Sequence, residues 1–294
     1  MNRQPSPVNP SMLRFGTAGW SYPDWEGIVY PKPRPKGFDP LEYLSGWVDT
    51  IEINSSFYAP PPEKNCFSWL YRVKDRPGFA FTLKLWRRFT HEREPYSAED
   101  TESFRRAAAV LAEGGRLGAI LAQFPMSFHN TPDNRAWLDR VFADFSEFPL
   151  ALEVRHGSWN QEEIYAWLLE KGIGFVNIDQ PLLGRAIRPS ARATAAVGYV
   201  RLHGRNYEEW FKEEAGRDER YNYLYSLAEL KPWAEKIQAL AGQCEEVFVV
   251  ANNHYKGQAL FNVLQLKELV TGRKPPFPES LVQVFGGGTD PSAA

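Results

Sequence analysis

The sequence contains little cysteine and no residue spacing typical of a metal or redox site. Only Cys66 and Cys244 occur among its 294 residues. Two distant cysteines do not form a disulfide framework in a chain of this size, and they fit a reducing compartment. No H-E-x-x-H motif or comparable ligand spacing is present. We therefore expect a cytoplasmic protein with two buried thiols, and with neither a metal nor a cofactor.

The sequence also lacks long apolar runs and a strong charge of either sign. No apolar run approaches the roughly 20 residues that a spanning helix needs, which predicts no membrane partner. Residues 1–12 have no apolar core typical of a signal peptide. The net charge of −2 gives no reason to expect nucleic acid as a partner. We expect a disordered tail over residues 1–12, one domain over 13–285 and a flexible tail over 286–294.

The chain alternates regularly between short strand-like segments and longer helical ones, which predicts a parallel sheet with right-handed crossovers. Eight such units in a chain of 294 residues match a single-domain (β/α)8 barrel of the TIM type. The sixth unit differs, because residues 180–194 are rich in proline, glycine and arginine and predict a weak or missing helix. The predicted strands are Leu13–Thr17, Thr50–Phe57, Phe79–Leu85, Leu117–Phe124, Leu150–Arg155, Gly174–Asp179, Val197–His203 and Glu246–Asn252.

An open doubly wound sheet is the competing architecture, and the segment after the first strand argues against it. Such sheets usually carry a glycine-rich phosphate-binding turn at that place. Here the strand leads into T-A-G-W-S-Y at residues 17–22, with neither G-x-G-x-x-G nor a Walker loop. The bulky Trp20 would block the close approach of a phosphate. The barrel is therefore the favoured fold.

Polar residues gather at the carboxyl ends of the predicted strands, where TIM-type barrels have their active sites. Residues at i and i+2 of a strand share a face, so each pair points to the same side. Seven of the eight strands show this asymmetry, which predicts a common polar pocket. The strand ends carry Glu52 and Asn54, Thr82 and Lys84, Gln123, Glu153 and Arg155, Asn177 and Asp179, Arg201 and His203, and Asn252 with His254.

Several segments together resemble the YecE-like family, also called domain of unknown function 72. The resemblance rests on G-T-A-G-W-S-Y at 16–22, E-I-N-S-S-F-Y at 52–58, F-T-L-K at 81–84, E-V-R-H at 153–156 and R-L-H-G at 201–204. It extends over nearly the whole chain. It implies a TIM-barrel-like fold, in agreement with the strand count, and it implies no activity.

The residue types in the predicted pocket suit a hydrolase- or isomerase-like enzyme that acts by acid/base chemistry on a small anionic or polar metabolite. Glu52 and Glu153 are the candidate acids or bases, and His203 is the candidate proton carrier. Arginine forks and a lysine amine bind phosphate or carboxylate groups. The candidate substrate-binding residues are Asn54, Lys84, Gln123, Arg155, Asp179, Arg201, Asn252 and Asn253, with Trp20 and Trp159 as an apolar rim for a sugar-like ring.

Other interpretations of the same residues stay open. The charges could form a salt-bridge network that closes the barrel top, because interior charges need partners. Carboxylates and histidines could bind divalent metals, as in a phosphodiesterase, nuclease or isomerase, although the neighbouring cations would repel the metal. The pocket could also bind a ligand without turnover. Residues 201–225 interleave basic and aromatic side chains, which suits single-stranded nucleic acid, but their acidic residues disfavour it. The oligomeric state is left open.

Overall fold

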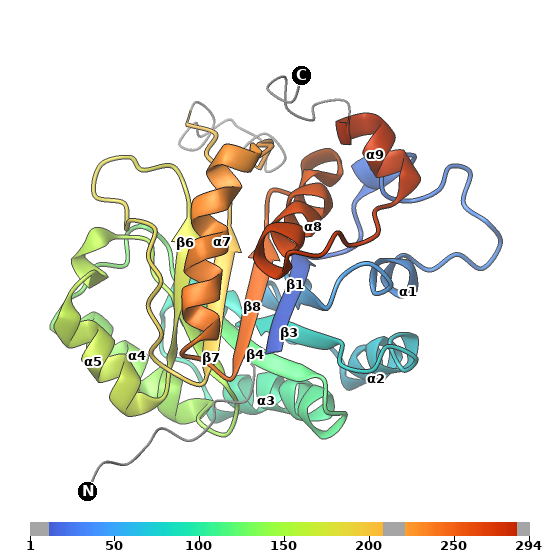
Figure 1. The fold of residues 1–294 in the computed structure, drawn as a ribbon. Coiled ribbons are helices and arrows are strands. Elements are labelled where there is room, and N and C mark those ends of the chain that lie inside the picture. The colour runs from blue at the N-terminus through green and yellow to red at the C-terminus, as the bar shows by residue number, and fades with distance from the viewer. Residues whose placement is uncertain (1–11, 208–220, 287–294) are drawn as a thin grey trace, which may run out of the picture.

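The computed structural model describes residues 12–207 and 221–286, in which eight parallel strands form one closed barrel. The strands follow one another in chain order, and the last strand closes on the first (Figure 1). This arrangement confirms the predicted barrel. Its strands are β1 (Met12–Ala18), β2 (Thr50–Ile53), β3 (Ala80–Lys84), β4 (Leu117–Gln123), β5 (Leu150–Glu153), β6 (Gly174–Asp179), β7 (Val197–Leu202) and β8 (Glu246–Ala251).

Helices surround the barrel, and the local sequence explains where several of them begin. Ser97 and Ser226 each form a capping box at a helix start, while Asp39 and Thr131 cap helices that begin with proline. No helix within the described ranges is long and apolar enough to cross a membrane. The helices are α1 (Pro40–Leu44), α2 (Glu63–Arg72), α3 (Ala98–Glu113), α4 (Pro132–Asp144), α5 (Glu162–Lys171), α7 (Leu227–Ala241), α8 (Gln258–Thr271) and α9 (Glu279–Phe285).

The connection between β6 and β7, residues 180–196, contains no helix, as its composition predicts. The Asn177 side chain on β6 anchors this connection. Its Oδ1 accepts hydrogen bonds from Ser190 Oγ at 2.7 Å and from the Arg192 backbone N–H at 2.8 Å. The loop therefore covers the outer face of β6 at the place where a sixth helix would pack.

The lower part of the barrel interior is filled by aromatic and apolar side chains. The rings of Tyr199 and Phe248 stack there with centroids 5.8 Å apart. Gly118 on β4 makes room for this pair, because an added Cβ would lie 2.1 Å from the Phe248 ring. Above this layer, toward the carboxyl ends of the strands, the inward side chains become charged.

Six predicted strands end earlier than the sequence predicts, four of them by one residue. β2 and β5 are shortened by more than one residue, and both places matter for the site. β2 ends at Ile53 and gives way to a 3-10 turn over Ser55–Phe57, while β5 ends at Glu153. The alternation of the sequence continues past the last ladder hydrogen bond of β2 and β5, which is why it predicts longer strands there. The predicted tails over 1–12 and 286–294 lie outside the described residues, apart from Met12 and Gly286.

Candidate functional site at the barrel mouth

A cavity of about 580 Å³ opens at the carboxyl ends of the strands. Strand ends and the loops that follow them form its walls. None of the described residues that line it is acidic. The predicted site residues found in its lining are Asn54, Lys84, Gln123, Arg155, Arg201 and Asn252.

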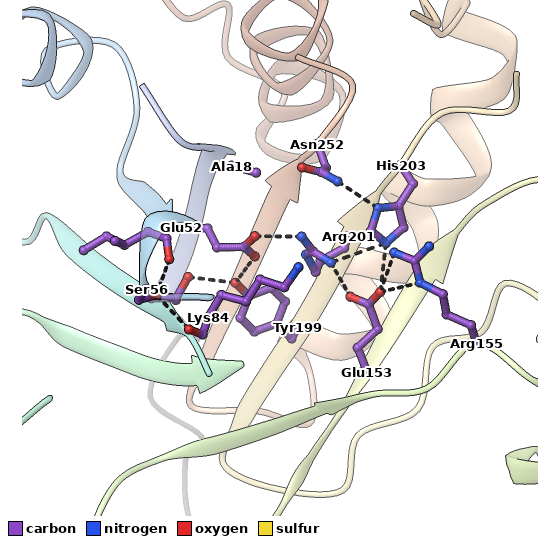
Figure 2. A network of polar contacts seen from close by, with 12 residues as sticks. Ala18, Glu52, Ser56, Lys84, Glu153, Arg155, Tyr199, Arg201, His203 and Asn252 are labelled. Atoms are coloured by element: carbon purple, nitrogen blue, oxygen red, sulfur yellow. Dashed lines mark hydrogen bonds and ion pairs between the residues drawn. The ribbon is translucent and has the colours of Figure 1, made fainter. Parts of the chain in front are cut away.

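Beneath the cavity, Arg201 joins two carboxylates in the barrel interior (Figure 2). Its Nη2 donates to Glu52 Oε1 at 2.7 Å, and its Nη1 makes a short contact with Glu153 Oε2. Both carboxylates are fully buried, and Arg201 is 1% exposed. Buried ions are costly unless their remaining oxygens and protons also find partners.

Glu52 finds its second partner in the aromatic layer below. The Tyr199 hydroxyl donates to Glu52 Oε2 at 2.9 Å. Because that bond uses the single phenolic proton, Thr82 Oγ1, which lies 2.8 Å from the Tyr199 oxygen, acts as the donor to Tyr199. Glu52 is therefore held by one arginine and one tyrosine, and a chain of hydrogen bonds links it to β3.

Glu153 has two further partners at its other oxygen. Arg155 Nε and His203 Nε2 lie 3.2 and 3.1 Å from Glu153 Oε1. Burial by itself would raise the pKa of Glu153, but Arg201, followed by His203 and Arg155, holds that pKa well below its usual range. Glu153 is therefore an anion across the physiological pH range.

His203 is a neutral imidazole in this setting. Burial lowers its pKa to about 3, against the attraction of Glu153. Its Nδ1 lies 3.0 Å from Asn252 Nδ2, which can only donate. The proton of the imidazole therefore sits on Nε2 and points to Glu153, so His203 is fixed between β5 and β8 and is fully buried.

Lys84 differs from the two arginines because it has no anionic partner among the residues that the structure describes. Among residues 12–207 and 221–286, its Nζ makes no hydrogen bond or ion pair, and it lies 4.2 Å from the centroid of the Phe57 ring. Burial, followed by repulsion from Arg201, lowers the pKa of Lys84 to about 7, although Glu52 and Glu153 oppose this effect. About half of the Lys84 amines are therefore neutral near pH 7.

The backbone around Lys84 is fixed by the turn after β2. The Ser56 hydroxyl is shared between the Ile53 carbonyl at 2.6 Å and the Lys84 carbonyl at 2.7 Å. Ile53 and Leu83 are register partners, so Asn54 and Lys84 leave the sheet side by side. Ser56 thus ties two strand ends together, and its proton is already used.

The structure corrects the placement of Asp179, which does not face the cavity. Arg205 holds its carboxylate with two hydrogen bonds, of 2.8 and 2.6 Å, and Trp233 on α7 donates to the same group. The reason is the alternation of side chains along β6. Ile178 is the register partner of the inward Arg201, so Ile178 points inward and the next residue, Asp179, points outward. Every residue of β6 is buried, so burial does not distinguish its two faces, and the polar Asn177 and Asp179 lie on the outer one.

The structure also corrects the predicted placement of Asn253, which does not face the cavity. Its neighbour Asn252 points into the barrel, so Asn253 points outward. There its Nδ2 donates to the Tyr223 carbonyl at 2.8 Å and to Asn262 Oδ1 at 3.0 Å. Asn253 therefore holds the loop after β7 against α8, and it does not line the cavity.

Replacing Asp179 with Asn tests this placement. We expect the free energy of unfolding to fall by about 1.5 kcal/mol, because charge-assisted hydrogen bonds to Arg205 are lost. We expect the affinity of any cavity ligand to stay unchanged, because Asp179 lies on the other face of β6. Urea unfolding and a binding titration on the same preparation measure both quantities. A large loss of affinity without a loss of stability would contradict the outward placement.

The predicted tryptophan rim is not formed by the two residues expected there. Trp159 is fully buried, stacks on Phe128 with centroids 5.4 Å apart and donates its indole N–H to the Phe128 carbonyl at 2.7 Å. Trp20 packs edge-to-face on Trp69 at 5.9 Å. Neither lines the cavity, and each packs against another aromatic ring outside it.

The groups that could have formed a metal site are spread over different places. His156 packs on His129 with ring centroids 4.0 Å apart, Asp179 faces outward, and His254 stacks on Tyr22 at the cavity wall. The described residues contain no group of three or more histidine, cysteine, aspartate or glutamate side chains that could hold a metal ion. Of residues 201–225, the segment considered for nucleic-acid binding, residues 208–220 lie outside the described residues.

Three residues of the site were missed in the sequence. Tyr199 lies two positions before Arg201, and Gln180 two positions after the inward Ile178, so strict alternation would have found both once the parity was known. His91 lines the cavity from the loop after β3. Burial, followed by the charge of Lys84, lowers the pKa of His91 to about 4, so this imidazole is neutral.

The chain is similar to known proteins in sequence and in structure. The family described as "Protein of unknown function DUF72" matches residues 14–282. The UPF0759 protein YunF of Bacillus subtilis is 32% identical over 274 residues, covering 88% of this chain and 95% of its own. A DUF72 family protein from Thermotoga maritima is 37% identical with a TM-score of 0.78, covering 88% of this chain and 99% of its own. A DUF72 family protein from Enterococcus faecalis is 24% identical with a TM-score of 0.78. The match covers 91% of this chain and 99% of that protein, and it shows the same fold.

Proposed function

The chain belongs to the DUF72 family, and on that premise we propose that its barrel mouth is the active site of an enzyme for a small anionic metabolite. The observation that carries the proposal is the charge at the cavity. Lys84, Arg155 and Arg201 line it, whereas the carboxylates of Glu52 and Glu153 lie beneath its floor and are fully buried. An anion that enters the cavity therefore meets cations first.

A count of these charges indicates how much negative charge the ligand carries. With Lys84 protonated there are three cations against two carboxylates, since His203 is neutral and Arg87, a fourth cation in the lining, is paired with Glu92. The unmatched charge belongs to Lys84, which has no anionic partner in the described residues. One negative charge on the ligand would complete the balance, which favours a monoanion such as a carboxylate or a phosphate ester.

In this proposal the buried groups position the cations, and Lys84 exchanges the proton. Glu153 stays ionised and holds Arg201 and Arg155, while Glu52 holds Arg201 from the other side. A general acid or base works best when its pKa lies near the working pH, and the Lys84 pKa of about 7 meets this condition. The acid/base roles predicted for Glu52, Glu153 and His203 become positioning roles.

Replacing Arg155 with Met tests the anion site. We expect glycolate, a monoanionic probe, to bind about 10- to 100-fold more weakly, because one charge-assisted hydrogen-bond donor is lost. Isothermal titration measures the affinity. Arg105→Met is the matched control, since Arg105 lies on the α3 surface and pairs with Glu147. Equal affinities in the wild type and both variants would contradict the anion site.

Turnover is tested by incubating the protein with mixtures of small carboxylates and phosphate esters and following their consumption by mass spectrometry. The proposed chemistry needs no metal, so activity should survive chelation with EDTA and should not increase when divalent metals are added. Loss of activity on chelation, with recovery on addition of one metal, would favour the metal-dependent alternative.

A further inference from the structure

The Lys84 amine is a nucleophile as well as a proton carrier when it is neutral. We propose that Lys84 forms an imine with the carbonyl group of a monoanionic substrate, such as a 2-oxo or aldehyde acid. This proposal rests on the proposed function and deepens it, because it names the substrate class. Lysine amines that are desolvated or lie beside other cations are suited to this reaction.

The position of Lys84 supports this role. Its side chain comes from the end of β3 and lines the cavity, and its backbone carbonyl is fixed by Ser56. In Figure 2 the amine end of Lys84 points toward the centre of the network, between the Glu52 and Glu153 sides. A salt bridge would hold the amine protonated and block its lone pair, but the described residues provide none. The amine is thus presented to the cavity in a reactive form.

The anion site lies where such a substrate needs it. Arg155 and Arg201 line the same cavity, so a carboxylate held by these arginines would bring an adjacent carbonyl carbon toward Lys84. The charges also agree with the product. An iminium ion on Lys84 carries the same single positive charge as the protonated lysine, and the carboxylate of the bound substrate balances it. The count of three cations, two carboxylates and one ligand anion is then conserved through the reaction.

The reaction is balanced without an oxidant or a reductant. The neutral Lys84 nitrogen attacks the carbonyl carbon and forms a C–N bond while the C=O π bond breaks, and a proton moves from this nitrogen to the oxygen, which becomes a hydroxyl group. Uptake of one proton from solvent, which replaces the proton that Lys84 lost on becoming neutral, and loss of water from this carbinolamine then give the iminium ion. Asn54 leaves the sheet beside Lys84. Its Oδ1 is buried and has no hydrogen-bond partner in the described residues. It is therefore available to accept a hydrogen bond from the carbinolamine.

The test uses two small acids that differ in their carbonyl group. The full-length protein is incubated near neutral pH with glyoxylate and cyanoborohydride, which reduces an imine to a stable carboxymethyl-lysine, and peptide mass spectrometry locates the adduct. We expect labelling of Lys84 at least about tenfold above that of the exposed Lys231, because far more of the Lys84 amine is neutral. Glycolate has no aldehyde group, so it should form no adduct and should block the labelling of Lys84 by glyoxylate.

Two variants and the glycolate titration make the outcome decisive. Lys84→Arg keeps the positive charge, so it should bind glycolate but lose the adduct, and Lys231→Arg should change neither. If glycolate binds in an Arg155-dependent manner but Lys84 is not labelled above Lys231, the imine is wrong and the anion site stands. If glycolate does not bind either, the proposed function fails as well. Thermal unfolding of each variant verifies that it is folded.

Discussion

Replacing Arg201 with Met should lower the free energy of unfolding by about 3–5 kcal/mol. This is the cost of removing one partner from a buried ion pair, because the remaining charge stays in a place that water does not reach. Arg201 contacts two such charges, Glu52 and Glu153, and both are fully buried. Urea unfolding, followed by circular dichroism, measures the change.

The loss should fall mainly on Glu52, which makes the prediction specific. Without Arg201, Glu153 keeps Arg155 and His203, whereas Glu52 keeps the Tyr199 hydroxyl as its partner among the described residues. Adding Glu52→Gln to Arg201→Met should therefore recover at least about 1 kcal/mol relative to the single variant. If Arg201→Met lowers the free energy of unfolding by less than about 1 kcal/mol, or if adding Glu52→Gln lowers it further, Arg201 does not stabilise the two buried carboxylates as its contacts indicate.

Replacing Lys84 with Met should stabilise the protein, by about 2–3 kcal/mol near pH 6. Burial lowers the pKa of Lys84 from 10.5 to about 7, so the folded state is penalised when the amine is charged. Each pKa unit corresponds to about 1.4 kcal/mol. The expected gain is smaller than the full pKa difference implies, because the side chain lines a cavity that opens to solvent, which screens its charge. Gains of this kind on removal of a site residue are typical of sites that trade stability for activity.

The sign of the pH dependence distinguishes this effect from better packing. Between about pH 7 and 10.5 the unfolded chain binds more protons at Lys84 than the folded one, so the stability of the wild type rises with pH. The advantage of Lys84→Met should therefore shrink across this range and be nearly lost at its upper end. Lys231→Met is the control, since Lys231 is exposed. A stability difference that stays constant with pH would show that packing, and not charge, is responsible.

The barrel was predictable because its two main signals are local. Strand and helix patterns alternate along the chain, and the polar residues stand at the carboxyl ends of the strands. The helix-free connection after β6 was equally visible, since proline and glycine in residues 180–194 disfavour a helix. The inward group Glu52, Lys84, Glu153, Arg155 and Arg201 followed from the same alternation, and Figure 2 shows these residues together.

What the sequence could not provide is the pairing of these charges. Lys84, Arg155 and Arg201 look equivalent along the chain, but only the folded barrel shows that Arg201 lies between two carboxylates and that Lys84 has no anionic partner among the described residues. That difference depends on contacts across about 50 to 150 residues of sequence, and alternation within one strand carries no information about them. The placement of Trp159 failed for the same reason, because its partner Phe128 comes from another connection.

The outward position of Asp179 also affects which register β6 adopts in the barrel. A shift of one residue along this strand would exchange the two faces, since side chains alternate strictly. It would bring the Asp179 carboxylate into a mouth that already contains two buried carboxylates, and it would leave Arg205 and Trp233 facing the apolar Ile178. The polar outer face of β6 thus penalises the shifted alignment and helps to select the one register in which the barrel closes.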